Sequence, residues 1–112
     1  MNPIEKFELK EWDRLIAINL TAPFITMKTA ISYWKSLKNP FGRIINISSV
    51  HGLVASVNKS AYVASKHGLN GLTKVAALEL ANTNITVNAI CLGWVDTKLV
   101  RKQIQVILLF KN

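Results

Sequence analysis

Two short apolar segments separated by a long helical pattern constrain this fold more than any other feature of the sequence. The segments Arg43–Val50 and Ile85–Cys91 are rich in β-branched residues and bounded by turn residues, which is typical of strands. Between them, Ser60–Asn82 carries apolar residues at helical spacing, with Ser60 as the predicted N-cap. This order predicts a right-handed βαβ unit with parallel strands. The nearly continuous apolar first strand predicts burial on both faces of the sheet.

A longer helical pattern precedes the βαβ unit. From Glu8 to Lys38, apolar residues recur mostly at three- and four-residue steps. Pro23 lies inside this pattern. Because proline lacks a backbone N–H and clashes with the preceding turn, we expect a kink or two segments near residues 19–23. A chain of 112 residues is long enough for one domain only, so the sequence predicts a single α/β domain.

Charge and cysteine content argue against several function classes. The net charge is +8, but the lysines and arginines are scattered and do not alternate with aromatic residues, which argues against a nucleic-acid surface. Cys91 is the only cysteine, so we expect no disulfide within the chain, no metal site, and Cys91 in the core. The start Met1–Glu5 lacks a leader pattern, and no uninterrupted apolar run approaches about 20 residues. We therefore expect a cytoplasmic chain with no membrane partner.

Three polar residues could together catalyse the oxidation of an alcohol. Tyr62 and Lys66 stand four residues apart in the predicted helix, so both side chains project from one face, although such pairs also occur by chance. Ser49 ends the first predicted strand, where side chains face the crevice at the carboxyl edge of a parallel sheet. Oxidation needs a base, and a phenol is mostly protonated at neutral pH. A nearby ammonium favours the phenolate, and a serine hydroxyl stabilises charge developing on oxygen.

With Asn19 in the long helix, these residues resemble the catalytic tetrad of the short-chain dehydrogenase/reductase family. The matching contexts are Ile18-Asn19-Leu20, Asn46-Ile47-Ser48-Ser49 and Tyr62-Val63-Ala64-Ser65-Lys66. The resemblance implies that Tyr62 is the base and Lys66 the cation that activates it. Ser49 would bind the substrate oxygen, and Asn19 would hold a water in a proton relay. The resemblance also implies a partial Rossmann-type doubly wound fold, with NAD as the cofactor held in part by Tyr62 and Lys66.

The segment from Ser49 to Tyr62 is most similar to the bacterial D-3-hydroxybutyrate dehydrogenases within that family. This branch oxidises (R)-3-hydroxybutyrate to acetoacetate with NAD, so the resemblance implies a small hydroxy acid as substrate. Four positions match the substrate pocket of the branch: His51, Lys59, Trp94 and Gln103. Three match the family's loop at the nicotinamide: Gly93, Val95 and Thr97. The resemblance further implies homo-oligomers or hetero-oligomers formed through the long helices.

The resemblance corresponds to the second half of the family's fold. The five glycines, at positions 42, 52, 68, 71 and 93, cannot form the glycine-rich turn that binds a dinucleotide pyrophosphate. We therefore expect one partial domain, residues 1–112, that lacks the N-terminal dinucleotide-binding half and binds NAD weakly. Residues 105–112 depart from the family as a divergent tail. Without neighbouring strands, Ile44–Ile47 should form an exposed edge, and the isolated chain should be marginally stable or dependent on a partner.

Three hypotheses about function follow. The chain is an oxidoreductase of this type in a truncated and impaired form, a non-catalytic remnant or assembly partner of a homologous dehydrogenase, or an enzyme like the 3-oxoacyl carrier-protein reductases. The last class shares Ser49, Tyr62 and Lys66 but needs no cationic pocket for a carboxylate. His51 and Lys59 therefore favour a hydroxy-acid substrate.

Overall fold

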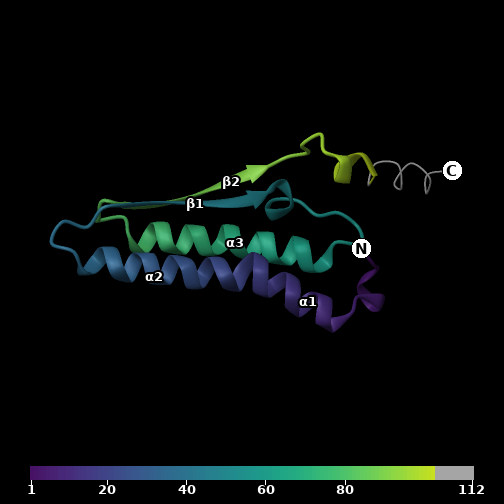
Figure 1. Cartoon of the computed structure of the whole chain (residues 1–112). Coiled ribbons are helices and arrows are strands. Elements are labelled where there is room, and N and C mark those ends of the chain that lie inside the picture. Colours follow the sequence, from purple (N-terminus) through teal and green to yellow (C-terminus); the bar gives the residue numbers. More distant parts are fainter. Residues whose placement is uncertain (103–112) are drawn as a thin grey trace.

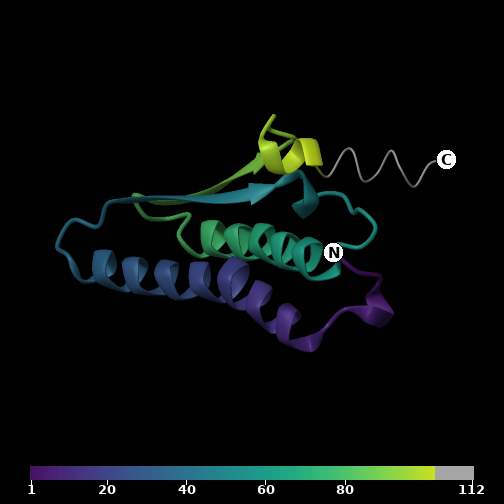
Figure 2. The ribbon, with the colours of Figure 1, turned by 45° about the vertical axis from the view of Figure 1, so that its right-hand side comes forward.

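A sheet layer and a helix layer make up the fold in the computed structural model, which describes residues 1–102. The strands β1 (Gly42–Ser49) and β2 (Ile85–Leu92) form the first layer, and α3 (Ser60–Glu79) covers one face of it. The helices α1 (Leu9–Ile16) and α2 (Ala22–Ser36) run beside α3 (Figures 1 and 2), and α2 also packs on the sheet, where Asn46 Nδ2 of β1 lies 3.3 Å from Met27 Sδ. The strands are parallel, in register from Gly42 opposite Ile85 to Ser49 opposite Leu92. The predicted βαβ unit and α/β class are thereby confirmed.

The long helix is divided at the predicted proline. Between α1 and α2, residues Ala17–Thr21 form a π-helical turn in which the Ala22 N–H donates to the Ala17 carbonyl. Pro23 is the second residue of α2. It has no N–H to donate to the preceding turn, and a wider turn accommodates the missing bond. The predicted division is confirmed, although the irregular turn begins two residues before the expected segment.

The continuous helical run Leu9–Ser36 is long and apolar enough to cross a bilayer by length and composition alone. The expectation of no membrane span considered only uninterrupted apolar stretches, and this run is interrupted by polar residues such as Asn19 and Lys28. Core helices of soluble proteins satisfy the same criterion. Much of the apolar surface of this run is exposed, including Ile18, Phe24 and Ile25.

The core lies where α2, α3 and β2 meet. Five buried residues pack together there: Met27, Ala76, Leu80, Ile85 and Val87. A polar connection crosses this layer, because the buried Asn46 Nδ2 of β1 donates to Thr73 Oγ1 of α3 at 2.8 Å. Thr73 Oγ1 in turn donates to the Leu69 carbonyl at 2.8 Å. The amide of Asn46 is therefore satisfied inside the sheet–helix interface, as burial requires.

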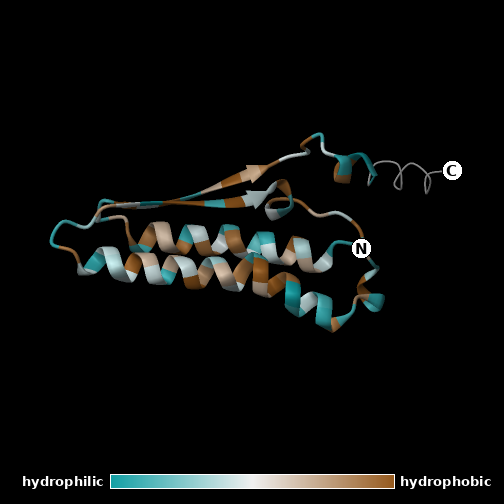
Figure 3. Ribbon diagram, viewed as in Figure 1, coloured by the Kyte–Doolittle hydropathy of each residue, from teal (hydrophilic) through white to brown (hydrophobic). Residues whose placement is uncertain are grey.

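Only one face of the sheet is covered, so the prediction of burial on both faces is wrong. Asn46 and Ser48 are buried toward the helices, whereas Ile45 and Ile47 are 59% and 55% exposed on the other face. Among the described residues β1 pairs only with β2, so its other edge is open, as expected. The exposed apolar surface continues to the end of β2, which Figure 3 draws in brown tones at Ile90–Leu92.

Two local predictions are also wrong. Cys91 is exposed although its Sγ lies 3.5 Å from Asn70 Nδ2 of α3, so the contact with this helix does not cover it. Ser60 is the first residue of α3 rather than its cap, and Lys59 occupies the N-cap position without a side-chain bond. The Ser60 hydroxyl is buried without a hydrogen-bond partner. The helix thus begins one residue earlier than the capping pattern predicted.

Candidate active site

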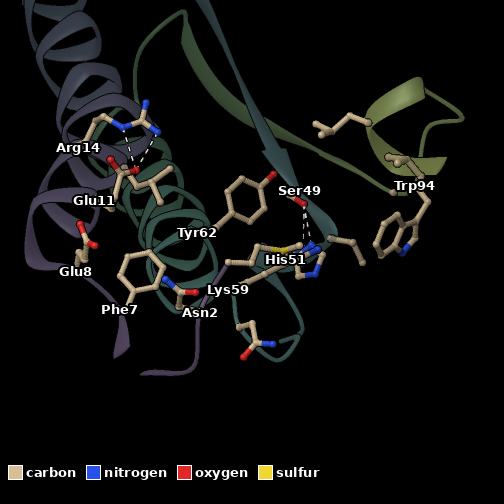
Figure 4. A pocket seen from close by; sticks show the side chains of 17 residues that line it. Asn2, Phe7, Glu8, Glu11, Arg14, Ser49, His51, Lys59, Tyr62 and Trp94 are labelled. Carbon is tan, nitrogen blue, oxygen red and sulfur yellow. Dashed lines mark hydrogen bonds and ion pairs between the residues drawn. The ribbon is translucent and has the colours of Figure 1, made fainter. Parts of the chain in front are cut away.

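A cavity of about 560 Å³ opens at the carboxyl ends of the two strands. From β1 the chain turns through a short 3₁₀ helix, Val50–Gly52, and this turn carries His51 into the cavity wall. Six of the residues named from the sequence line the cavity: Ser49, His51, Lys59, Tyr62, Gly93 and Trp94 (Figure 4). Parallel strands direct their carboxyl ends to the same edge, which is why distant segments meet there.

Ser49 and His51 are joined by two contacts at the end of β1. The Ser49 Oγ accepts the His51 backbone N–H at 3.1 Å and lies 3.5 Å from His51 Nδ1, as the dashed lines in Figure 4 show. On the other side of the ring, His51 Nε2 lies 2.7 Å from Ser56 Oγ. His51 is 6% exposed. Burial, and secondarily the charge of Lys59, lower the pKa of His51 below its usual value.

Aromatic rings surround His51 and position Lys59. The His51 ring meets Tyr62 and Trp94 edge-on, with centroids 5.8 and 6.2 Å apart. The Lys59 ammonium lies 4.9 Å from the Trp94 ring centroid, a cation–π geometry. No carboxylate pairs with Lys59 among the described residues. A cation without a counterion, beside the catalytic phenol predicted from the sequence, is suited to an anionic ligand.

Lys66 lies beside Tyr62 but is bound elsewhere. Its ammonium is 5.8 Å from the Tyr62 ring centroid and donates to the Ile47 carbonyl at 2.9 Å. Because the Gly42 N–H faces β2 and backbone groups alternate along a strand, the Ile47 carbonyl faces the open edge of β1. Burial lowers the pKa of Lys66. The lysine thus satisfies a carbonyl that has no strand partner within residues 1–102.

Asn19 and Lys66 line a second cavity of about 480 Å³ beside that open edge, together with Asn46 and Pro23. The Asn19 Nδ2 donates to Ser65 Oγ at 3.3 Å. Of the four residues named for the tetrad, Ser49 and Tyr62 therefore share the first cavity, and Asn19 and Lys66 share the second. The two pairs line different cavities, although the Lys66 ammonium lies only 5.8 Å from the Tyr62 ring centroid.

The residues named for the nicotinamide loop are mostly open to solvent. Gly93 lines the first cavity, and a Cβ added there would meet no atom within 4 Å. Val95 is 55% exposed. Thr97 Oγ1 accepts the Val100 N–H at 3.2 Å and so caps a short helix over residues 98–102. Gln103 lies outside the described residues.

Several lining residues were not foreseen from the sequence. Phe7 and the ion pair of Arg14 with Glu11, at 3.1 Å, reach the cavity from the N-terminal segment and α1. Ser56 contacts His51 from a loop. The i,i+3 spacing of Glu11 and Arg14 could have indicated their pairing. No pattern in the sequence relates Ser56 to His51, because the contact depends on the path of the loop.

Gly52 lies directly after His51 and has no room for a side chain. A Cβ at this position would overlap the Asn70 side chain and approach the Lys66 carbonyl to 2.8 Å. We expect Gly52→Ala to destabilise the chain by about 1–3 kcal/mol, as overpacking does. Gly71→Ala is the control, because a Cβ there meets nothing within 4 Å and alanine favours helix. Equal unfolding midpoints in urea for the two variants would contradict this account.

Comparison with known proteins decides the family. A family model described as short chain dehydrogenase matches residues 1–106. The chain belongs to the short-chain dehydrogenase family. It is 57% identical over 102 residues to a D-beta-hydroxybutyrate dehydrogenase of Cupriavidus necator, covering 91% of this chain and 39% of that protein. A D-beta-hydroxybutyrate dehydrogenase of Rhizobium meliloti is 58% identical over 101 residues, covering 90% of this chain and 38% of that protein.

Solved structures give the same family. A 4-hydroxyisoleucine dehydrogenase mutant complexed with NADH and succinate superposes with a TM-score of 0.84 at 38% identity. That superposition covers 93% of this chain and 42% of the other. The chain thus spans about two fifths of the length of the short-chain dehydrogenases it matches. The fold class predicted from the sequence, part of a Rossmann-type fold, agrees with these relatives.

Proposed function

We propose that the chain carries the alcohol-oxidising site of a 3-hydroxybutyrate dehydrogenase, which converts (R)-3-hydroxybutyrate to acetoacetate with NAD. The observation that carries this proposal is the meeting of Ser49, Tyr62 and Lys59 in one cavity. A hydroxyl donor, a phenol and a cation without a carboxylate partner are what a short hydroxy acid requires. Two relatives named D-beta-hydroxybutyrate dehydrogenase, at 57% and 58% identity, support the choice of substrate.

Different residues of this chain bind the substrate and transfer its proton. The Tyr62 phenolate takes the proton of the substrate hydroxyl. The Lys66 ammonium stabilises this phenolate once the ammonium has left the Ile47 carbonyl. The Ser49 hydroxyl donates to the substrate oxygen while charge develops on it. The Lys59 ammonium, beside Trp94, binds the carboxylate and fixes the distance between the carboxylate and the reacting carbon. The hydride acceptor for that carbon would be supplied by bound NAD.

The residues that would hold the nicotinamide end fit it in part. Gly93 offers open space beside the cavity, and Lys66 offers an ammonium for ribose hydroxyls. Val95 and Thr97 follow in the same loop as further candidates. No glycine-rich turn stands between a strand and a helix N-terminus in the described residues, so no backbone cradle for the pyrophosphate is formed by them. We therefore expect the chain alone to bind NAD weakly and to turn over slowly. As proposals we retain a cytoplasmic location and oligomers formed through the long helices.

A second candidate function is supported by the open edge of β1. An unpaired strand edge beside exposed Ile45 and Ile47 is a surface for pairing with another polypeptide. Under this alternative the chain is an assembly partner of a homologous dehydrogenase and has no turnover of its own. An enzyme like the 3-oxoacyl carrier-protein reductases is disfavoured, because such a substrate gives Lys59 no carboxylate to bind.

The test is formation of NADH by the purified chain with (R)-3-hydroxybutyrate, alongside calorimetry with NAD. We expect slow turnover of this enantiomer, and Lys59→Ala should raise KM about tenfold or more while changing kcat little, since a charge-assisted bond to the carboxylate is lost. Lys74→Ala, at an exposed position on α3, is the control. Absence of both turnover and NAD binding would favour the assembly partner. Turnover with an unchanged KM in Lys59→Ala would remove the argument for a carboxylate substrate.

A further inference from the structure

Both ring nitrogens of His51 face serine hydroxyls. Nε2 lies 2.7 Å from Ser56 Oγ, and Nδ1 lies 3.5 Å from Ser49 Oγ. The first of these contacts comes from the loop between β1 and α3. The ring is buried at 6% exposure, so these two hydroxyls take the place that water would have beside an exposed imidazole.

His51 is held as a neutral imidazole in this environment. Burial and the nearby Lys59 charge lower its pKa, which favours the neutral form of the ring. A neutral imidazole has one N–H donor and one acceptor nitrogen, so the two serines cannot be bound in the same way. Either Nδ1 or Nε2 carries the proton. The partner of each nitrogen decides which.

The bonds of Ser49 distinguish the two arrangements. A serine hydroxyl has one donor and two acceptor lone pairs. Ser49 Oγ already accepts the backbone N–H of His51 at 3.1 Å. If Nδ1 carries the proton, it fills the second lone pair, and only the O–H of Ser49 remains, free to donate to a ligand. If Nδ1 is an acceptor, it competes with the ligand for that same O–H.

We infer that Ser56 is a positioning residue: its hydroxyl donates to His51 Nε2, fixes the proton on Nδ1, and thereby makes Ser49 a donor toward the substrate oxygen. This inference rests on the proposed function, because that function requires Ser49 to donate. His51 thus orients Ser49 while it lines the same cavity as Lys59.

The position of the proton can be measured directly. In the chain labelled with ¹⁵N at its two histidines, the imidazole nitrogen shifts distinguish the two tautomers above the pKa of His51. His67 is an internal reference, since its Nδ1 lies 3.0 Å from the Val63 carbonyl and must carry a proton to bind it. We expect His51 to give the same Nδ1–H pattern as His67. An Nε2–H pattern for His51 in the unmodified chain would overturn the inference.

Substitution of Ser56 tests the cause. Ser56→Ala should lower the ratio of the Nδ1–H to the Nε2–H form about fivefold, the effect of one net hydrogen bond, and Ser56→Thr, which keeps a hydroxyl, should restore it. Ser36→Ala, at an exposed position on α2, should leave the ratio unchanged. An unchanged ratio in Ser56→Ala would also overturn the inference. The measurement needs no turnover, so a chain with the Nδ1–H form and no activity refutes the proposed function and leaves the role of Ser56 intact.

Discussion

Tyr62→Phe is expected to reduce NADH formation from (R)-3-hydroxybutyrate by about 10³-fold or more relative to the unmodified chain. The substitution removes the one phenol in the cavity and keeps the ring that meets His51 edge-on. Packing is therefore preserved while the base is lost. The measurement is the initial rate at saturating NAD and substrate, with the unfolding midpoint taken for each variant.

Tyr33→Phe is the matched control for this change. Tyr33 lies on α2 with 63% of its surface exposed and does not line either cavity. We expect its rate to equal that of the unmodified chain. If Tyr62→Phe kept more than a tenth of the original rate, some other group would be taking the hydroxyl proton, and the proposed roles of Tyr62 and Lys66 would both fail.

Leu69→Ala is expected to destabilise the fold by about 2–5 kcal/mol, the range for a leucine removed from a packed interior. Leu69 is 2% exposed on the face of α3 that meets the sheet. A small chain with one covered sheet face has a small free energy of unfolding. We therefore expect Leu69→Ala to show no cooperative unfolding transition in urea near room temperature, as followed by circular dichroism.

Leu78→Ala provides the comparison on the same helix. Leu78 is 78% exposed, so the same atoms are removed without leaving a cavity. Its unfolding free energy should stay within about 0.5 kcal/mol of the unmodified chain. Similar losses for both leucines would mean that α3 is not packed on the sheet in solution as the structure has it.

Local patterns predicted most of this fold. The strand–helix–strand order and the division at Pro23 depend on residue spacing and on the missing proline N–H, which act within a few residues. The open edge of β1 was expected, but the uncovered sheet face with Ile45 and Ile47, and the exposure of Cys91, could not be predicted in the same way. Their apolar character indicates covered surface, but whether a surface is covered depends on which other segments are present.

The candidate site was likewise predicted only in part from the sequence. Ser49, His51, Lys59 and Tyr62 were named from the sequence, and the structure brings them to one cavity because the turn after β1 and the start of α3 are adjacent. The bond of Lys66 to a strand carbonyl and the contact of Ser56 with His51 depend on the open edge and on the loop path. Neither leaves a signature in residue spacing.

The Lys66 ammonium binds the Ile47 carbonyl at the sheet edge, and the same ammonium is the one proposed to stabilise the Tyr62 phenolate. Any ligand that draws Lys66 away leaves that carbonyl to water or to another donor. Thermodynamic reciprocity then applies: a donor that takes over the carbonyl changes the affinity for the ligand by the same factor as the ligand changes the affinity for the donor. On the proposed role of Lys66, extension of the sheet and occupation of the site are therefore linked equilibria.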